Sequence, residues 1–463
     1  MGAVLYTAIV ARERTLFSCQ NCGHQTPKWL GRCPDCGRWE SLVEERVAPP
    51  ARGGRRPAGS EGRPTPLSEI VADGEERRST GIGELDRVLG GGLVQGSIVL
   101  LGGDPGIGKS TLALQACGAL AGQGLPVLYV AGEESPEQVR LRADRLGLGA
   151  SGILVLPETT AETVVEQIDR VRPCAVVVDS IQTLHTTALS SAPGSVGQVR
   201  ESAALLVGRC KATQTACFLI GHVTKEGSLA GPRVLEHMVD TVLYFEGDGA
   251  HALRVLRAVK NRFGSTNEVG VFEMGERGLA EVSNPSAAFL AERPVGAPGS
   301  AVLATLEGSR PVLVEIQALV SRSQLAMPRR TPIGLDPGRT ALLLAILEKR
   351  CHLRLHDQDV FLNVAGGLRV DEPAADLAVL ASVASSARGK ALSGDIVLWG
   401  EVGLTGEVRS VARADVRVRE AARQGFTRCV LPAGNARGLV VESGTQVRGV
   451  ATVAELFEVL ELS

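Results

Sequence analysis

The sequence predicts an α/β protein of several domains, and three observations lead to this prediction. A length of 463 residues corresponds to about three domains at roughly 150 residues each. Short apolar runs at 97–101, 127–130, 175–178 and 217–220 have the length and composition of buried parallel strands. The first run leads through a glycine-rich loop into an apolar helical stretch from Leu112, which is the strand–loop–helix order of open α/β sheets.

The composition excludes a strong electrostatic field around the whole protein. With 49 basic and 51 acidic residues the formal net charge is −2, so any binding of nucleic acid has to be local. Aromatic residues make up only 3%, which argues against a surface built mainly from rings that stack on single-stranded bases. The N-terminus lacks a secretory pattern, and glycines and a proline break the longest charge-free stretch, at 110–132. We therefore expect a cytoplasmic protein that does not contact membranes.

Four of the ten cysteines form a regular pattern near the N-terminus. Cys19, Cys22, Cys33 and Cys36 make C-x2-C-x10-C-x2-C, in which two pairs of thiolates can converge on one Zn²⁺. Two disulfides are the alternative, but a chain without an export signal belongs in a reducing compartment. Four protein ligands leave no open position for a substrate, so residues 17–45 are expected to form a structural zinc finger rather than a catalytic site.

A segment rich in proline, glycine and arginine follows the zinc finger. Residues 49–66 hold five prolines and four glycines in eighteen positions. This composition is typical of a tether, so residues 46–66 are expected to form a linker. Its arginines are expected to be solvated, with a weak contact to phosphate as the alternative.

The clearest motif lies at the first predicted strand. Residues 103–110 fit G-x-x-x-x-G-K-S in the strand–loop–helix context that a phosphate loop requires. Glycines let the backbone wrap phosphates, and the N-terminus of the helix adds N–H groups and a positive dipole end. Lys109 is expected to reach the β- and γ-phosphates of ATP, Ser110 to bind Mg²⁺ and Thr111 to contact the α-phosphate. The predicted nucleotide-binding residues of the loop are Gly103, Asp104, Pro105, Gly106, Ile107, Gly108, Lys109, Ser110 and Thr111.

Three acidic residues are candidates for the hydrolytic chemistry. Asp179 ends a predicted strand and suits a second contact to Mg²⁺, directly or through water. Ser180 follows it where some ATPases place a catalytic glutamate, so the base has to come from another strand. Glu133 and Glu134 follow a different strand, at the edge of the sheet where ligands bind. We expect Glu133 to orient and deprotonate the attacking water, with Glu134 as the alternative or as a structural acid at the helix start.

Two further loops carry cations at the ends of strands. His222 and Lys225 follow the fourth predicted strand and are placed to sense the γ-phosphate. Lys260, one of only seven lysines, stands beside Arg262 on a turn after another strand. Such cations commonly complete the phosphate site of a neighbouring subunit, and a solvated basic turn is the alternative. This second motif, KNRFG, comprises Lys260, Asn261, Arg262, Phe263 and Gly264.

These motifs, in this order, resemble those of a known family. The four-cysteine element, the phosphate loop and KNRFG are similar to those of the bacterial RadA (Sms) family of RecA-type ATPases, which acts in recombination and DNA repair. The resemblance runs from about Phe17 to the C-terminus. It implies a RecA-like ATPase core at 67–285, in which Lys109 and Ser110 contact phosphate and magnesium and Asp179 is the Walker B acid.

The resemblance also implies an assembly and its partners. It suggests a homo-hexameric ring that encircles single-stranded DNA, binds ATP between subunits and extends branched recombination intermediates beside the RecA recombinase. Lys260 and Arg262 are then expected to act across the subunit interface or to couple ATP to DNA. DNA-binding loops are expected around 186–200 and 225–237. A DNA-dependent ATPase is therefore the leading hypothesis, and a KaiC-like autokinase or a nucleotide-gated interaction module is the alternative.

The last third of the chain, 299–463, is expected to form a separate α+β domain. Its strand and helix patterns lie at 302–306, 312–318, 339–349, 360–364 and 373–387, with further strands near Ile396 and Val402. The alternation of the two pattern types predicts a sheet covered by helices.

This C-terminal domain resembles the proteolytic domain of Lon, which uses a serine activated by a lysine. Ala374 or Ala375 stands where the Lon pattern carries its serine, and no lysine follows Lys390, so we expect no peptidase activity. The domain is expected instead to help build the ring and to offer a basic surface to duplex DNA, with a solvated helix face as the alternative for any single arginine. The candidates for that surface are Arg409, Arg413, Arg417 and Arg419.

Overall fold

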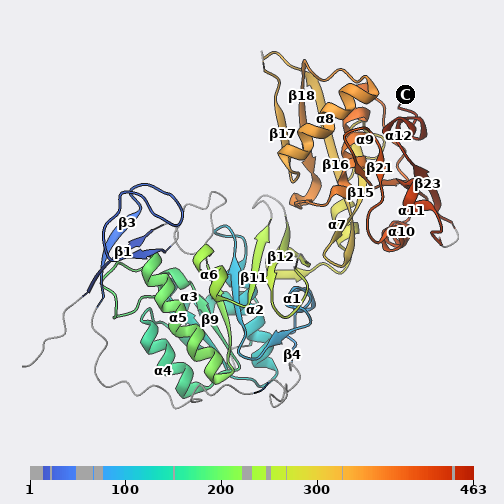
Figure 1. Cartoon of the computed structure of the whole chain (residues 1–463). Helices are drawn as coiled ribbons and strands as arrows, with labels where there is room; N and C mark the ends of the chain where they lie inside the picture. Colours follow the sequence, from blue (N-terminus) through green and yellow to red (C-terminus); the bar gives the residue numbers. More distant parts are fainter. Residues whose placement is uncertain are drawn as a thin grey trace, which may run out of the picture. The chain divides into compact units, whose positions relative to one another are not determined.

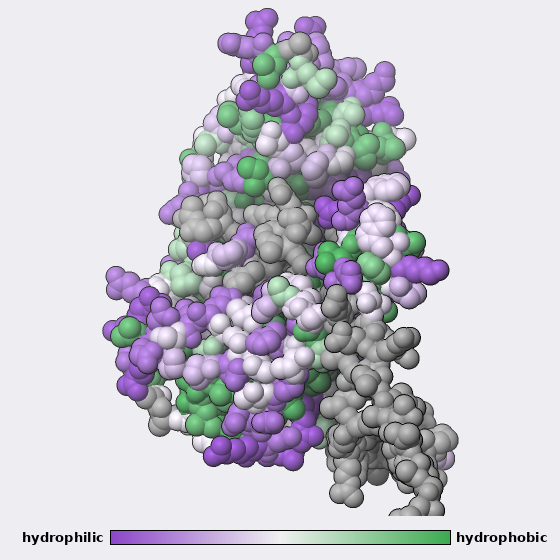
Figure 2. All heavy atoms as spheres, turned by 90° about the vertical axis from the view of Figure 1, so that its left-hand side faces the viewer, coloured by the Kyte–Doolittle hydropathy of each residue, from purple (hydrophilic) through white to green (hydrophobic). Residues whose placement is uncertain are grey.

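The structure is a computed structural model that describes residues 14–20, 23–47, 66, 77–149, 152–221, 232–246, 252–266, 268–325, 327–440 and 444–462. The chain divides into two units (Figure 1). The first contains residues 1–245, 256–270 and 274–280, and the second contains 246–255, 271–273 and 281–463. Within the described residues, none of the helices has the length and hydrophobicity needed to span a bilayer. On the face shown in Figure 2, hydrophobic side chains form small patches between hydrophilic ones.

A nine-stranded sheet, in the order β14-β13-β12-β11-β6-β10-β9-β7-β8, dominates the first unit. Its strands are β6 (Ile98–Gly102), β7 (Val127–Ala131), β8 (Ile153–Leu156), β9 (Ala175–Asp179), β10 (Ala216–Ile220), β11 (Thr241–Glu246), β12 (Leu253–Asn261), β13 (Val269–Gly275) and β14 (Gly278–Glu281). The six strands from β11 to β8 pair in parallel. The four apolar runs of the sequence are confirmed as β6, β7, β9 and β10, within one residue at each end.

Helices bury the central strands from both faces, which explains why those strands are wholly apolar in sequence. They are α2 (Lys109–Gly122), α3 (Pro136–Arg145), α4 (Ala161–Val171) and α5 (Val196–Thr213). Helices α4 and α5 lie side by side (Figure 1). Their residues Ile168 and Leu206 pack with Leu100, Val130 and Val178 of the sheet in one buried cluster. Every residue of β6, β7, β9 and β10 is buried.

The cysteine-rich module forms a small three-stranded antiparallel sheet in the order β2-β1-β3. Its strands are β1 (Arg14–Cys19), β2 (Gln25–Thr26) and β3 (Leu42–Val47). Among the described residues, the buried cluster of this module consists of Cys19, Cys33 and Leu42, with Phe17 packed against it. So small an apolar core contributes little hydrophobic stabilisation, which is typical of modules that a metal ion holds together.

The second unit is built on a mixed seven-stranded sheet in the order β17-β18-β16-β15-β19-β22-β23. The strands are β15 (Ser300–Glu307), β16 (Arg310–Arg322), β17 (Arg330–Ile333), β18 (Gln358–Val364), β19 (Ile396–Leu398), β22 (Arg428–Pro432) and β23 (Gln446–Val450). The helices include α8 (Pro337–Cys351), α9 (Asp376–Arg388) and α10 (Ala414–Arg423). The strand and helix patterns expected in the last third of the chain are confirmed, except that residues 373–375 form a separate 3₁₀ turn before α9.

Candidate functional site

The predicted phosphate loop connects the end of β6 to the start of α2. Gly103 and Gly108 have φ angles of 143° and 120°, where residues with a side chain are strained. A Cβ at Gly103 would also lie 3.0 Å from the Cβ of Phe245, and one at Gly108 would lie 2.8 Å from Cε of Met274. No side chain of the described residues caps the start of α2, and its first turn carries no acidic residue. The loop therefore presents backbone groups and a positive helix end to an anion.

Lys109 is the first residue of α2, and its side chain folds back onto this loop. Its Nζ donates hydrogen bonds to the carbonyl oxygens of Gly103, at 2.8 Å, and Asp104, at 2.9 Å. Burial lowers the pKa of Lys109, although the charges of Asp179, Asp104 and Glu133 act in the opposite direction. The negative charges of these three carboxylates act on the ammonium, and phosphate oxygens could replace the two carbonyls as its hydrogen-bond partners.

Asp179 receives a hydrogen bond that the sequence did not reveal. The hydroxyl of Tyr129 on β7 donates to Oδ2 of Asp179 at the end of the adjacent β9, over 2.5 Å. Both residues are buried, and burial together with the nearby Asp179 raises the pKa of Tyr129 well above its usual range. The phenol thus stays protonated and fixes one oxygen of the carboxylate. The sequence feature that could have indicated this contact is a tyrosine, one of only three in the chain, within an otherwise aliphatic strand.

Tyr129→Phe is expected to raise the Mg²⁺ concentration needed for half-maximal ATP turnover by about tenfold. A hydrogen bond to a charged group contributes about 1.5–3 kcal/mol, and its loss would leave the Asp179 carboxylate less well oriented for a cation. The measurement is ATP turnover against magnesium concentration. Tyr244→Phe is the matched control, because Tyr244 donates to Glu236 over 2.8 Å. An equal Mg²⁺ requirement in both variants would contradict the role of Tyr129.

The structure separates the two candidate glutamates. Glu133 accepts a hydrogen bond from the hydroxyl of Ser180, the residue that follows Asp179. Glu134 instead forms an ion pair with Arg142 on α3, and both partners are partly buried. Glu133 therefore lies on the side of Lys109 and Asp179, whereas Glu134 ties its loop to the helix. The serine that stands in place of a carboxylate after Asp179 is the residue that holds Glu133.

A cavity of about 370 Å³ lies beside the start of α2. Gln115 on α2 exchanges two hydrogen bonds of 3.0 Å with the backbone of Leu279 and so anchors the β13–β14 hairpin next to the helix. The residues that line the cavity are Thr111, Arg145, Met274, Gly275, Glu276 and Gly278. Because Thr111 continues the phosphate loop, this cavity lies next to the predicted phosphate site. Neither Arg145 nor the hairpin carries a motif that would have identified it in the sequence.

The KNRFG residues contact other parts of the first unit. Nζ of Lys260 donates to the carbonyl oxygens of Glu236, at 2.7 Å, and Val239, at 2.8 Å, at the end of α6 (Pro232–Met238). Burial lowers the pKa of Lys260. Arg262 lies 3.1 Å from Oδ1 of Asp240 and is 57% exposed. Lys260 is therefore engaged with a helix end of its own chain, while the Arg262 guanidinium reaches the surface.

The remainder of the motif is packed against the first helix of the unit. Nδ2 of Asn261 donates to the carbonyl of Val88 in α1 (Gly83–Leu89) over 3.1 Å. The carbonyl of Phe263 accepts from Arg77 over 2.6 Å. A Cβ at Gly264 would lie 2.8 Å from Cα of Gly90, so only glycine permits this approach.

Three of the four predicted zinc ligands lie together. The Sγ atoms of Cys19, Cys33 and Cys36 lie within 4.8 Å of one another, and those of Cys19 and Cys36 are 3.7 Å apart. Sulfur atoms arranged tetrahedrally around Zn²⁺ at about 2.3 Å would be separated by about 3.8 Å. The three thiols therefore fit one zinc ion. Cys22, like His222 and Lys225, lies outside the described residues.

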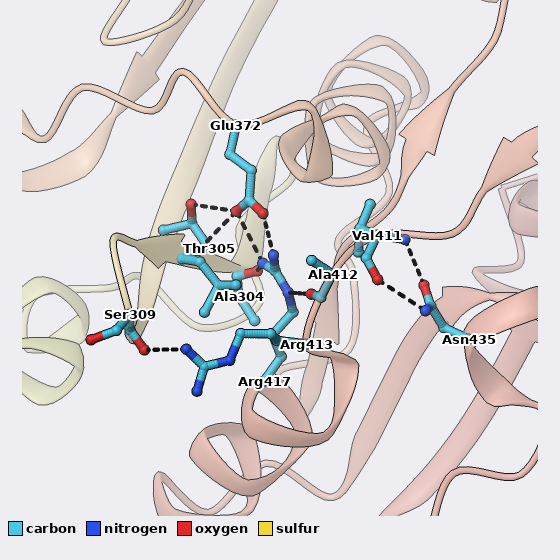
Figure 3. Close-up of polar contacts among 10 residues, drawn as sticks. Ala304, Thr305, Ser309, Glu372, Val411, Ala412, Arg413, Arg417 and Asn435 are labelled. Carbon is cyan, nitrogen blue, oxygen red and sulfur yellow. Dashed lines mark hydrogen bonds and ion pairs between the residues drawn. The ribbon is translucent and has the colours of Figure 1, made fainter. Parts of the chain in front are cut away.

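The C-terminal arginines differ from the expected basic surface. Arg417 is fully buried, forms an ion pair with Glu372 and donates to the carbonyls of Ala304, at 2.6 Å, and Ala412, at 3.2 Å (Figure 3). Its assignment to a DNA-binding surface is wrong, because a buried guanidinium is stable only when its donors are paired within the protein. Arg413 donates to the carbonyl of Ser309 over 3.2 Å.

Arg409 and Arg419 remain on the surface but have acidic neighbours. Arg409 pairs with Glu407, and Arg419 pairs with Asp415 over 2.6 Å. Both arginines are more than half exposed. These local pairs reduce the charge that either side chain offers to a phosphate.

Three family models match the chain. A model of the rubredoxin metal binding domain matches residues 17–44, a model of the KaiC ATPases matches 78–153, and a model of the C-terminal proteolytic domain of Lon protease matches 347–462. Together with the topology described above, these matches confirm the predicted fold class: a RecA-like α/β ATPase core between a zinc module and a Lon-like domain.

Curated relatives match over nearly the whole length. The DNA repair protein RadA of Bacillus subtilis is 53% identical over 451 residues, which cover 96% of this chain and 98% of that protein. The DNA repair protein RadA of Pseudomonas aeruginosa is 53% identical over 453 residues, which cover 97% of this chain and all of that protein. Among solved structures, a KaiC-like protein from Pyrococcus horikoshii aligns with 45% of this chain and 100% of its own at 21% identity and a TM-score of 0.37.

Proposed function

This chain belongs to the RadA family of DNA repair proteins, and from that premise we propose that it is a DNA-dependent ATPase that moves along DNA during recombinational repair. One observation carries the proposal. The buried ammonium of Lys109 shares its electrostatic surroundings with Asp179 and Glu133, which come from neighbouring strands at the same edge of the sheet. A lysine at a glycine-rich loop, with two carboxylates at the same edge of the sheet, is the set of residues that phosphoryl transfer from a nucleotide uses.

In the proposed reaction each residue has one task. Lys109 would exchange its carbonyl partners for oxygens of the β- and γ-phosphates, and Ser110 and Asp179 would hold magnesium. Bound magnesium would supply the positive charge that neutralises the phosphate oxygens. Glu133 accepts the proton of the attacking water while the Ser180 hydroxyl holds its carboxylate in place. Tyr129 keeps Asp179 oriented throughout.

The proposal includes a homo-hexameric ring that acts on single-stranded and branched DNA together with the RecA recombinase. The segments at 186–200 and 225–237 would contact DNA, and Arg262 would reach the ATP of a neighbouring subunit. Neither segment is a loop throughout, because residues 196–200 begin α5 and residues 232–237 belong to α6, while residues 225–231 lie outside the described residues. The exposure of the Arg262 guanidinium supports this role. The two hydrogen bonds from Lys260 to the end of α6 support a second role, in which the KNRFG segment transmits a change at the ATP site to the segment that precedes α6. The predicted turn begins later than expected, because Lys260 and Asn261 are the last two residues of β12.

Peptidase activity is not part of the proposal. Ala374 and Ala375 have no nucleophilic atom, and no lysine follows Lys390 in the sequence. A serine protease of this kind needs both a serine nucleophile and a lysine base. The Lon-like unit is better suited to a structural role in the ring.

Lys109→Ala and Lys260→Ala are both expected to abolish branch migration, but only Lys109→Ala should also abolish ATP binding. Lys109 would contact the phosphates, whereas Lys260 would couple the nucleotide to movement. The measurements are binding of a fluorescent ATP analogue, ATP turnover with and without single-stranded DNA, and movement on a branched substrate. Lys349→Ala, an exposed lysine on α8, is the control.

Two results would contradict this function. Failure of Lys260→Ala to bind nucleotide would show that Lys260 belongs to the binding site itself. Turnover that DNA does not stimulate, together with phosphate appearing on the protein, would favour an autokinase instead.

A further inference from the structure

Two of the three tryptophans are exposed on the cysteine-rich module. Trp29 is 57% exposed and Trp39 is 70% exposed, whereas Trp399 in the second unit is fully buried. Indole rings are among the largest apolar side chains, and burying one of them in a complex is strongly favourable. In a chain with only 3% aromatic residues, two exposed indoles in one small module indicate a binding surface.

The backbone brings the two rings together. The amide of Glu40 donates to the carbonyl of Gly31 over 2.8 Å, and Arg32 pairs with Trp39 across an antiparallel bridge. A Cβ built on Gly31 would lie 3.7 Å from Cη2 of Trp29 and 3.7 Å from Cζ3 of Trp39. Both indoles therefore border the same point beside Gly31, where the absence of a side chain leaves ring surface accessible.

Cations flank both rings. Lys28 precedes Trp29, Arg38 precedes Trp39, and the guanidinium of Arg32 lies 5.9 Å from the centroid of the Trp39 ring. These three side chains are exposed. Aromatic faces accompanied by cations are typical of surfaces that bind single-stranded nucleic acid, because the rings stack on bases while the cations meet phosphates. Lysine, in contrast, is depleted at protein–protein interfaces, so the exposed Lys28 favours nucleic acid.

We propose that Trp29 and Trp39 form a platform on which bases of single-stranded DNA stack, separate from the loops of the ATPase core. The module also carries the exposed acids Asp35, Glu40 and Glu44, which balance the three cations. Binding at the platform combines stacking on the rings with contacts of the cations to phosphates, so it is expected to weaken as the salt concentration rises. This site adds a DNA contact to the proposed function and rests on that function only for the identity of the ligand.

The test uses the full-length protein and an oligodeoxythymidylate of about 20 nucleotides, without ATP. Stacking on exposed indoles should quench tryptophan emission, and the buried Trp399 should contribute a constant background. The double variant Trp29→Ala/Trp39→Ala is expected to lose the quenching and to bind the oligonucleotide at least about tenfold more weakly. Trp29→Phe/Trp39→Phe should keep its affinity within about threefold of the unmodified protein, because phenyl rings still stack.

Two controls support the interpretation of this test. The zinc content of each variant shows that the module is folded, and Leu30→Ala tests whether hydrophobic contact alone matters at this surface. Unchanged affinity and no quenching, with turnover still stimulated by DNA, would overturn the platform but leave the proposed function standing. A second outcome is that the double alanine variant binds DNA normally and loses movement only in assays that contain a partner protein. That result would assign the rings to the partner protein and would also overturn the proposal. Absence of both DNA binding and DNA-stimulated turnover would contradict both proposals.

Discussion

Glu133→Gln should lower ATP turnover by about 10²–10⁴-fold and leave ATP binding intact. Glutamine keeps the size of the side chain and can still accept the hydrogen bond that Ser180 donates to Glu133. It cannot take a proton from water, so the variant removes the proposed base and little else. The measurements are the rate of phosphate release and, separately, the affinity for a fluorescent ATP analogue.

Glu134→Gln is the matched control for this prediction. Glu134 is one residue away, but its carboxylate pairs with Arg142 and a second carboxylate oxygen is buried without a hydrogen-bond partner among the described residues. We expect its replacement to change turnover by less than about fivefold, since its bond to α3 is structural. If Glu134→Gln loses turnover and Glu133→Gln retains it, the base has been assigned to the wrong residue.

The four strands β6, β7, β9 and β10 of the ATPase core could be predicted from the sequence because every residue in them is buried. A strand such as β9 then becomes a short run of aliphatic residues, and the residue that ends it, Asp179, is identified at the same time. The phosphate loop could be predicted for a similar reason, since its glycines are required by the local backbone. Both features are determined by residues close together in the chain.

The contacts that distinguish the candidate site residues are not local. Tyr129 and Asp179 are 50 residues apart, and they meet only because β7 and β9 pair in parallel with Ala131 beside Asp179. The same pairing brings Ser180 to Glu133. Without the register of the two strands, the sequence offers Glu133 and Glu134 as equivalent neighbours at the end of one strand.

The helical spacing of apolar residues around Arg417 indicates that this side chain is buried, but its charge suggests a surface position. Ala414, Val418 and Ala421 of α10 are buried at helical spacing, and Arg417 lies on the same face. A charged residue on an apolar face requires a partner inside the protein. That partner, Glu372, is 45 residues earlier in the chain, so no local pattern could identify it.

Arg417→Met is expected to destabilise the C-terminal unit by about 3–5 kcal/mol. Methionine fills most of the space of the arginine stem but removes the charge that faces Glu372. Glu372 would then keep only its hydrogen bonds from Thr305, at 3.1 Å, and from the amide of Leu306, at 2.8 Å (Figure 3). Unfolding in denaturant, followed through the emission of the buried Trp399, measures the change.

A second substitution, at Glu372, distinguishes the loss of a charge pair from the loss of packing. If the cost of Arg417→Met comes from an unpaired Glu372 carboxylate, then Arg417→Met/Glu372→Gln should recover most of the lost stability, because replacing both charges of a buried pair is often nearly neutral. Arg419→Met, two residues away and 58% exposed, should change stability by less than about 0.5 kcal/mol. A double variant as unstable as Arg417→Met alone would show that the arginine contributes through its stem. Either way, the charge at position 417 is held by the fold of this unit, which is why it is not available to DNA.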